Sequence, residues 1–283
     1  MACELPAKLG LPLSRFSRSE LRRQILAAGI VAEISGMTIW RWLRQDAIRP
    51  WSHRSWVFPR DPDFAAKAGV VLDLYHRRWK DRPLGPRDFV ISADEKTQIQ
   101  LITPVDPIAA PRPGHPMRVS SEYRRHGTGA YLAAWDVHRA ALFGSVVPSI
   151  SINAFEQLVA AVMKRAPYRT ARRVFWIVDN GTIHRGYRAA QRLRARWPNL
   201  ILVHLPVHAS WLNQVEIYFS ILQRKALTPS NFATLAAATD RILGFQKHYQ
   251  TVARPFEWKF TRRDLARLLA RCTQPANGLK RAA

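Results

Sequence analysis

The sequence predicts an α/β fold in which a mixed β-sheet is flanked by helices, with a small helical module before it. Two observations lead to this prediction. From residue 89 onward, short apolar runs alternate with amphipathic segments in the order β-β-β-α-β-α-β-α. Before them, the segment 49–62 is rich in Pro, Trp and Arg, which disfavours regular helix and suits a linker. We therefore predict a module with its linker over 1–60 and a main domain over 61–283.

Two short helices are predicted near the N-terminus. A capping-box spacing that begins at Ser17 predicts a helix over 18–28, and Ser35 can cap a second helix that continues to Asp46. Such a helix-turn-helix, or winged-helix-like, module can place its second helix in a DNA groove, although plain packing of two helices is the alternative. The second helix carries the basic residues that we expect to contact DNA: Arg41 and Arg44.

The main domain is expected to contain five strands and several helices. The predicted elements are a helix over 63–79, strands over 89–102, 130–136 and 141–147, a helix over 153–165 capped by Asn153 and Glu156, a strand over 174–178, a helix over 185–197, a strand over 200–205, and helices over 210–226, 235–249 and 262–271. The first three strands form an antiparallel meander joined by a hairpin at 137–140. This order is the one that an RNase H-like fold requires.

Three acids stand at positions of this fold where they can meet. Asp94 follows the first strand, Asp179 ends the fourth strand, and Glu216 lies on the last helix of the sheet domain, at the margin of an apolar face. A single acid at a strand end means little, because chains turn polar there. Three carboxylates together suit Mg²⁺ or Mn²⁺, and two such ions about 3.5–4 Å apart can hold the attacking and leaving oxygens of a phosphodiester.

The neighbours of the second acid are also polar. Asn180 follows Asp179 directly, and His184 is open to three roles: contact with phosphate, positioning of water, or capping of the next helix. That helix presents arginines on one side, which form either a phosphate-binding track or a solvated cationic face. The arginines that we assign to DNA binding there are Arg185, Arg188 and Arg192.

The charge of the chain indicates a polyanionic partner. Its 44 Lys and Arg outnumber 20 Asp and Glu, which gives a formal net charge of +24. Nucleic acid is the commonest partner of such a surface. The alternative is that the many arginines reflect a GC-rich genome and only solvate surface helices. The sequence has no apolar run long enough for a membrane helix and no apolar signal core, so we expect a cytoplasmic protein. Its two cysteines predict neither a disulfide framework nor structural zinc.

Three segments resemble a known family. SADEKTQIQ, FWIVDNGTIH and HLPVHASWLNQVEIYFSILQRK are similar to the mariner-related DDE transposases, specifically the bacterial insertion-sequence-630 family. The 36 residues between Asp179 and Glu216 fall inside the spacing of that family. By resemblance, Asp94, Asp179 and Glu216 are the ligands of two Mg²⁺ or Mn²⁺ ions. The residues that accompany them by resemblance are Asn180, His184 and Asn213.

The resemblance implies cut-and-paste DNA transposition. The enzyme would hydrolyse double-stranded DNA at terminal inverted repeats and join the freed 3′-OH to target DNA at TA. We expect a homodimer that holds two DNA ends, working at the bacterial nucleoid in the cytoplasm. Relatives of full length carry two helix-turn-helix units, and only one is visible here. The alternative is therefore a truncated or domesticated copy that acts as a DNA-binding regulator or as a nuclease without transposition.

Overall fold

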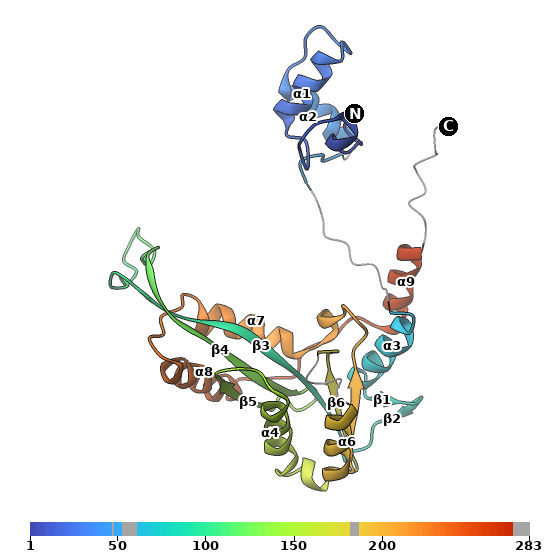
Figure 1. The fold of residues 1–283 in the computed structure, drawn as a ribbon. Helices are drawn as coiled ribbons and strands as arrows, with labels where there is room; N and C mark the ends of the chain where they lie inside the picture. The colour runs from blue at the N-terminus through green and yellow to red at the C-terminus, as the bar shows by residue number, and fades with distance from the viewer. Residues whose placement is uncertain (47, 53–60, 182–186, 274–283) are drawn as a thin grey trace. The chain divides into compact units, whose positions relative to one another are not determined.

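The computed structural model describes most of the chain (Figure 1): residues 1–46, 48–52, 61–181 and 187–273. The chain divides into two compact units, Met1–Val57 and Phe58–Ala283. Each unit folds around hydrophobic core residues of its own. No helix within the described residues is long and apolar enough to cross a membrane.

The first unit contains the two expected helices, α1 (Arg18–Ala27) and α2 (Gly36–Gln45). The predicted capping box is confirmed, because Ser17 and Glu20 exchange hydrogen bonds of 3.2 and 2.8 Å between side chain and backbone. The Oγ of Ser35 accepts from the backbone N–H of Thr38 at 3.0 Å and begins α2, as predicted. The described residues of this unit contain no β-strand that could form a wing. Its buried core consists of Phe16, Leu21, Ile34, Ile39 and Leu43.

The second unit is built on a five-stranded mixed sheet, which confirms the predicted fold class. The strands are β3 (Asp88–Pro104), β4 (Tyr123–Asp136), β5 (Leu142–Val147), β6 (Arg173–Val178) and β7 (Leu200–His204). Their order across the sheet is β5-β4-β3-β6-β7. The pairs β3–β4 and β4–β5 are antiparallel, whereas β3–β6 and β6–β7 are parallel. Strand β3 is therefore central and has one partner of each kind.

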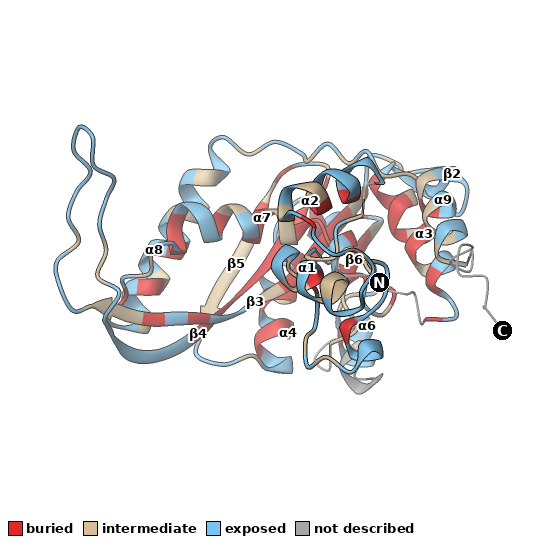
Figure 2. Ribbon diagram, turned by 90° about the horizontal axis from the view of Figure 1, so that it is seen from above, coloured by how far each residue is buried: buried red, intermediate tan, exposed pale blue. Residues whose placement is uncertain are grey.

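Helices cover both faces of this sheet (Figure 1). One face packs against α3 (Phe64–Tyr75), α7 (Val215–Leu222), α8 (Leu235–Gln250) and α9 (Arg262–Thr273). The other packs against α4 (Ile152–Met163) and α6 (Tyr187–Arg196). Because side chains alternate along a strand, neighbouring residues such as Phe175 and Trp176 enter opposite cores. Figure 2 shows the buried residues along the strands and on the helix faces that meet them.

Some predicted boundaries are wrong. The helix predicted over 63–79 ends at Tyr75, because Arg77 adopts a left-handed backbone conformation (φ 58°) that a right-handed helix cannot continue. A two-stranded hairpin follows, formed by β1 (Arg78–Trp79) and β2 (Arg82–Pro83). The cap of α4 is not Asn153 or Glu156 but Ser151, whose Oγ accepts from the backbone N–H of Ala154 at 3.1 Å.

The helix predicted over 210–226 is interrupted, and the interruption matters for the site. A short 3₁₀ turn, Ser210–Leu212, is followed by Asn213 in an extended conformation (φ −83°, ψ 109°). Helix α7 begins only at Val215, and a π-helical turn, Gln223–Leu227, follows it. The tertiary contacts of Asn213, described below, replace the helical hydrogen bonds that an unbroken helix would have made.

Candidate active site

The central strand and its parallel neighbour place two carboxylates close together. Parallel pairing of β3 with β6 ends at Ser92 and Ile177. Asp94 lies two residues beyond Ser92, and Asp179 directly follows the last residue of β6. The sequence placed Asp94 directly after the apolar run 89–93. Strand β3 continues past it, as the strand predicted over 89–102 requires, by pairing with β4, where Asp94 lies opposite Ala133. Both acids therefore lie at the edge where the parallel part of the sheet stops.

Asp94 is the deeper of the two, with only 7% of its surface exposed. Its Oδ2 accepts a hydrogen bond of 2.9 Å from Nδ2 of Asn213, and its Oδ1 accepts one of 2.8 Å from the backbone N–H of Glu95. Burial raises the pKa of Asp94 to about 8, and the negative charges of Glu95, Asp179 and Glu216 push it in the same direction. The charges of Asp179 and Glu216 thus act on the carboxyl group of Asp94.

Asn213 connects the first and third acids. Its side chain is 1% exposed, and its Nδ2 also donates to the carbonyl oxygen of Ala93 at 3.0 Å. The sequence marked Asn213 only by its resemblance to a motif, and the structure shows a direct contact with Asp94. Because α7 begins two residues later, this contact ties the start of that helix to strand β3.

Glu216 lies in the first turn of α7 and is half-buried, as its place at the margin of an apolar face predicted. Burial raises the pKa of Glu216 and the charge of Asp179 raises it further, while Lys96 on β3 acts in the opposite direction. Lys96 is itself affected, since burial lowers the pKa of its ammonium group. The charge of Lys96, which lies on the same strand as Asp94, thus acts on the acid of α7.

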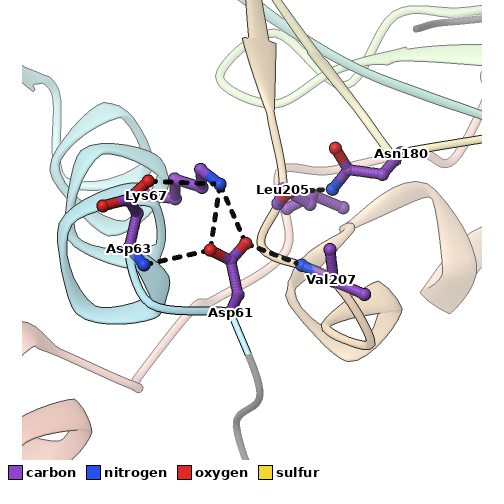
Figure 3. A network of polar contacts seen from close by, with 6 residues as sticks. All are labelled: Asp61, Asp63, Lys67, Asn180, Leu205 and Val207. Atoms are coloured by element: carbon purple, nitrogen blue, oxygen red, sulfur yellow. Dashed lines mark hydrogen bonds and ion pairs between the residues drawn. The ribbon is translucent and has the colours of Figure 1, made fainter.

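Asp179 and Asn180 are held by a turn at the end of β6. The Oδ1 of Asp179 accepts from the backbone N–H of Gly181 at 2.7 Å. Gly181 is needed for this approach, because a Cβ there would lie 2.8 Å from the same oxygen. The amide of Asn180 donates to the carbonyl oxygen of Leu205, just after β7 (Figure 3). Asn180 therefore links the ends of two parallel strands beside the second carboxylate.

The three acids come from three elements, β3, the end of β6 and α7, and could hold a metal between them. Within the described residues, however, no three His, Cys, Asp or Glu side chains are already gathered closely enough to hold an ion. The trio is thus a set of carboxylates that repel one another at one sheet edge, and not a closed ligand cage. His184 and Arg185 lie outside the described residues, as does the side chain of Arg188.

Comparison with known families decides the class of this site. The sequence model of the DDE superfamily endonucleases matches residues 90–237, which span all three carboxylates and more than half of the chain. The chain belongs to this family. Its DDE endonuclease domain thus includes strands β3 to β7 and extends into α8. None of the curated proteins matches the chain by sequence.

Solved structures of the Mos1 transposase are similar in fold to this chain. The Mos1 mariner paired-end complex with Mn gives a TM-score of 0.53 at 16% identity, over 93% of this chain and 78% of the Mos1 chain. The Mos1 paired-end complex with left transposon end gives 0.51 at 16% identity with the same coverage. The Mos1 strand transfer complex gives 0.51 at 15%, again over 93% and 78%. At these identities the likeness concerns the fold, and it supports the RNase H-like architecture.

One further residue near the DDE site was not predicted from the sequence. Asp61 falls in the segment predicted as linker, yet its side chain is 3% exposed. It accepts from the Nζ of Lys67 at 2.9 and 3.0 Å and from the backbone N–H of Val207 at 3.2 Å (Figure 3). The hydrogen bond from Lys67 holds the pKa of Asp61 below its usual range. Asp61 thereby fixes the segment after β7, which also accepts the hydrogen bond of Asn180. No local sequence pattern indicates this role of Asp61.

The predicted DNA-binding arginines differ in their surroundings. Arg41 and Arg44 are exposed on α2, and the guanidinium of Arg44 lies 5.1 Å from the ring centre of Trp40. Arg192 on α6 instead donates to Oε1 of Glu156 at 2.6 and 3.0 Å. Since that ion pair offsets its charge, Arg192 is less available to phosphate than the sequence suggested.

Proposed function

We propose that this chain is a DNA transposase that hydrolyses phosphodiester bonds at the ends of its element and transfers the freed strand into target DNA at TA. The observation that carries the proposal is the match of residues 90–237 to the DDE endonuclease family, within which Asp94, Asp179 and Glu216 come from β3, the end of β6 and α7. The likeness in fold to Mos1 transposase complexes supports the same conclusion.

Two divalent cations, Mg²⁺ or Mn²⁺, fit the chemistry of this site. Asp94, Asp179 and Glu216 would hold them, because carboxylate oxygens are the ligands that these ions prefer. The raised pKa values of Asp94 and Glu216 reflect burial and mutual repulsion, both of which a bound cation relieves. When bound, such ions lower the pKa of an attacking water or hydroxyl and stabilise the leaving oxygen.

The side chains around the trio would orient its carboxylates. Asn213 holds Oδ2 of Asp94 and leaves the opposite carboxylate oxygen to the backbone N–H of Glu95. Gly181 and Asn180 fix the second acid at the end of β6. In hydrolysis, one P–O bond to water forms as the bond to the 3′-oxygen breaks. In strand transfer, the freed 3′-oxygen forms a new P–O bond to a target phosphate as the bond from that phosphate to the target's own 3′-oxygen breaks, and the departing 3′-oxygen takes up a proton. Neither step needs an oxidant or a reductant.

Double-stranded DNA is the proposed partner, bound at terminal inverted repeats and at the TA target. The net charge of +24 favours a polyanion, and the exposed Arg41 and Arg44 on α2 offer cations to phosphate. We expect a homodimer on DNA, because transposition joins two element ends in one event. The Mos1 structures with a similar fold are named as paired-end complexes, which is consistent with this.

Nicking of supercoiled plasmid in Mg²⁺ or Mn²⁺ tests the proposal. The wild-type chain should nick, and Asp179→Asn should nick at least about a thousandfold more slowly, since metal-assisted charge stabilisation contributes several kcal/mol. Asp240→Asn, an exposed acid on α8, is the matched control and should nick normally. Equal nicking by wild type and Asp179→Asn would refute the proposal. If the chain nicks DNA but does not join cut ends to TA sites, it is a nuclease and not a transposase.

A further inference from the structure

A buried four-residue loop, Leu212–Val215, stands between the first and third acids and is held by two neutral hydroxyl groups. The phenol of Tyr75, on α3, donates to the carbonyl oxygen of Leu212 at 2.6 Å and accepts from the backbone N–H of Gln214 at 3.3 Å. The hydroxyl of Ser92, on β3, donates to Oδ1 of Asn213 and accepts from the backbone N–H of Val215 at 2.9 Å. Each hydroxyl therefore bridges two points of the loop.

Both hydroxyls are fixed by their own surroundings. Ser92 is 0% exposed in the middle of the central strand, two residues before Asp94. Tyr75 is buried at the end of α3, and its ring meets that of Trp258 edge-on at 5.1 Å between centres. Neither group can turn to water, so neither has an alternative hydrogen-bond partner in solvent.

The loop links the carboxylates in a short path. Asn213 donates to Asp94 from one end of the loop, and Glu216 follows Val215 at the other end. If either hydroxyl were lost, buried backbone or amide groups of the loop would lose their partners. The loop would then rotate to recover hydrogen bonds, and α7 would change the position of Glu216 relative to Asp94.

We propose that Tyr75 and Ser92 are positioning residues that set the separation of Asp94 and Glu216, and so set the affinity of the site for divalent cations. The inference rests on the proposed function, because it concerns the same carboxylates. Tyr75 lies before residues 90–237, the part of the chain that the DDE family model matches. The endonuclease site thus depends on a helix that precedes the matched domain.

Tyr75→Phe and Ser92→Ala test the inference, because each removes little more than one hydroxyl. Tyr131→Phe is the matched control: its phenol is also buried in this unit but donates to Oε1 of Gln246 on α8, at 2.7 Å. Binding of Mn²⁺ to the wild-type chain and to each variant is measured by electron paramagnetic resonance of the free ion. Melting temperatures in EDTA, measured in parallel, report the structural cost of each change.

The melting temperature should fall by about 2–4 °C for each hydrogen bond lost in a unit of this size. Tyr75→Phe and Ser92→Ala each lose two and Tyr131→Phe loses one, so all three variants should melt earlier. Only Tyr75→Phe and Ser92→Ala should weaken Mn²⁺ binding, by about tenfold, as changes around metal ligands do. The double variant should lose less Mn²⁺ affinity than the product of the two single-variant losses, because both hydroxyls act on one loop.

Two results would overturn the inference, and they are distinguishable. If wild type binds Mn²⁺ and nicks DNA while the Mn²⁺ affinities of Tyr75→Phe and Ser92→Ala match that of Tyr131→Phe, the hydroxyls serve stability alone. If wild type neither binds Mn²⁺ nor nicks DNA, the proposed function itself fails and the inference fails with it.

Discussion

The two carboxylates at the sheet edge are held in different ways. Asp94 is buried, and besides the bond from the backbone N–H of the next residue, Glu95, it takes a hydrogen bond from Asn213, which lies 119 residues further along the chain. Asp179 is half-buried, and Gly181, two residues further on, donates to it. The first acid is therefore placed by packing between distant elements, whereas a local turn contributes to placing the second.

This difference predicts different consequences of substitution. A buried acid whose partners come from other elements couples catalytic geometry to the stability of the core, because the same hydrogen bonds serve both. An acid in a turn can be displaced with little effect on the core. Variants that separate loss of cleavage from loss of stability thus test the comparison directly.

Asn213→Ala should have the largest effect. It leaves Oδ2 of Asp94 and the hydroxyl of Ser92 without their amide partner in a buried site. We expect cleavage to fall at least about a hundredfold and the free energy of unfolding to fall by about 2–4 kcal/mol. Single-turnover nicking and urea unfolding measure the two effects. A variant that loses cleavage but keeps full stability would contradict the coupling at Asp94.

Gly181→Ala should come next, with the opposite balance. The new Cβ would lie 2.8 Å from Oδ1 of Asp179, so the carboxylate must turn away. Cleavage should fall about ten- to a hundredfold, because small misplacements of reacting groups are costly. Unfolding free energy should change by less than about 1 kcal/mol. Gly244→Ala on α8, where a Cβ has open space, is the control and should cleave normally. A large loss of stability in Gly181→Ala would show that the turn is part of the core.

Asp61→Asn should have a smaller effect on cleavage. It removes the ion pair with Lys67 and weakens the anchor of Val207, which lies two residues from the acceptor of Asn180. We expect nicking to slow about threefold, since the anchor acts on Asp179 through several intervening groups. Asp63→Asn, an exposed neighbour 3.7 Å from Lys67, is the matched control. Equal rates for the two variants would mean that the anchor does not reach the active site.

Asp88→Asn should leave cleavage unchanged, since Asp88 lies at the opposite end of the β3–β6 pair from the carboxylates. Arg173 donates to it at 2.9 and 2.6 Å and lowers its pKa. A lowered pKa in the folded state gives stability that is complete above the ordinary Asp pKa and is lost as pH falls through the folded value. The variant should lose about 1–2 kcal/mol at pH 7 and progressively less toward pH 3. Thermal unfolding of wild type and Asp88→Asn between pH 7 and pH 3 measures this change. A stability difference between the two proteins that does not vary with pH would contradict the prediction.

Local patterns in the sequence were sufficient for the sheet and for the acids on it. Apolar runs marked the core strands, and polar residues marked where parallel pairing stops, so Asp179 was placed correctly at the end of β6. Element boundaries were less certain where backbone conformation was decisive. Arg77 ended α3 early, and Asn213 interrupted the helix expected over 210–226. Neither residue type announces such a break, because both occur within ordinary helices.

The sequence by itself determined the five strands of the main sheet and the placement of Asp179 directly after β6, because periodicity and strand order are carried by residues close together in the chain. Only the tertiary structure decided what holds the carboxylates. Tyr75 and Ser92 look like ordinary core residues, and Asp61 looks like part of a linker. Their roles arise from hydrogen bonds across 121 to 146 positions of sequence, and such partners are chosen by packing and not by local propensity.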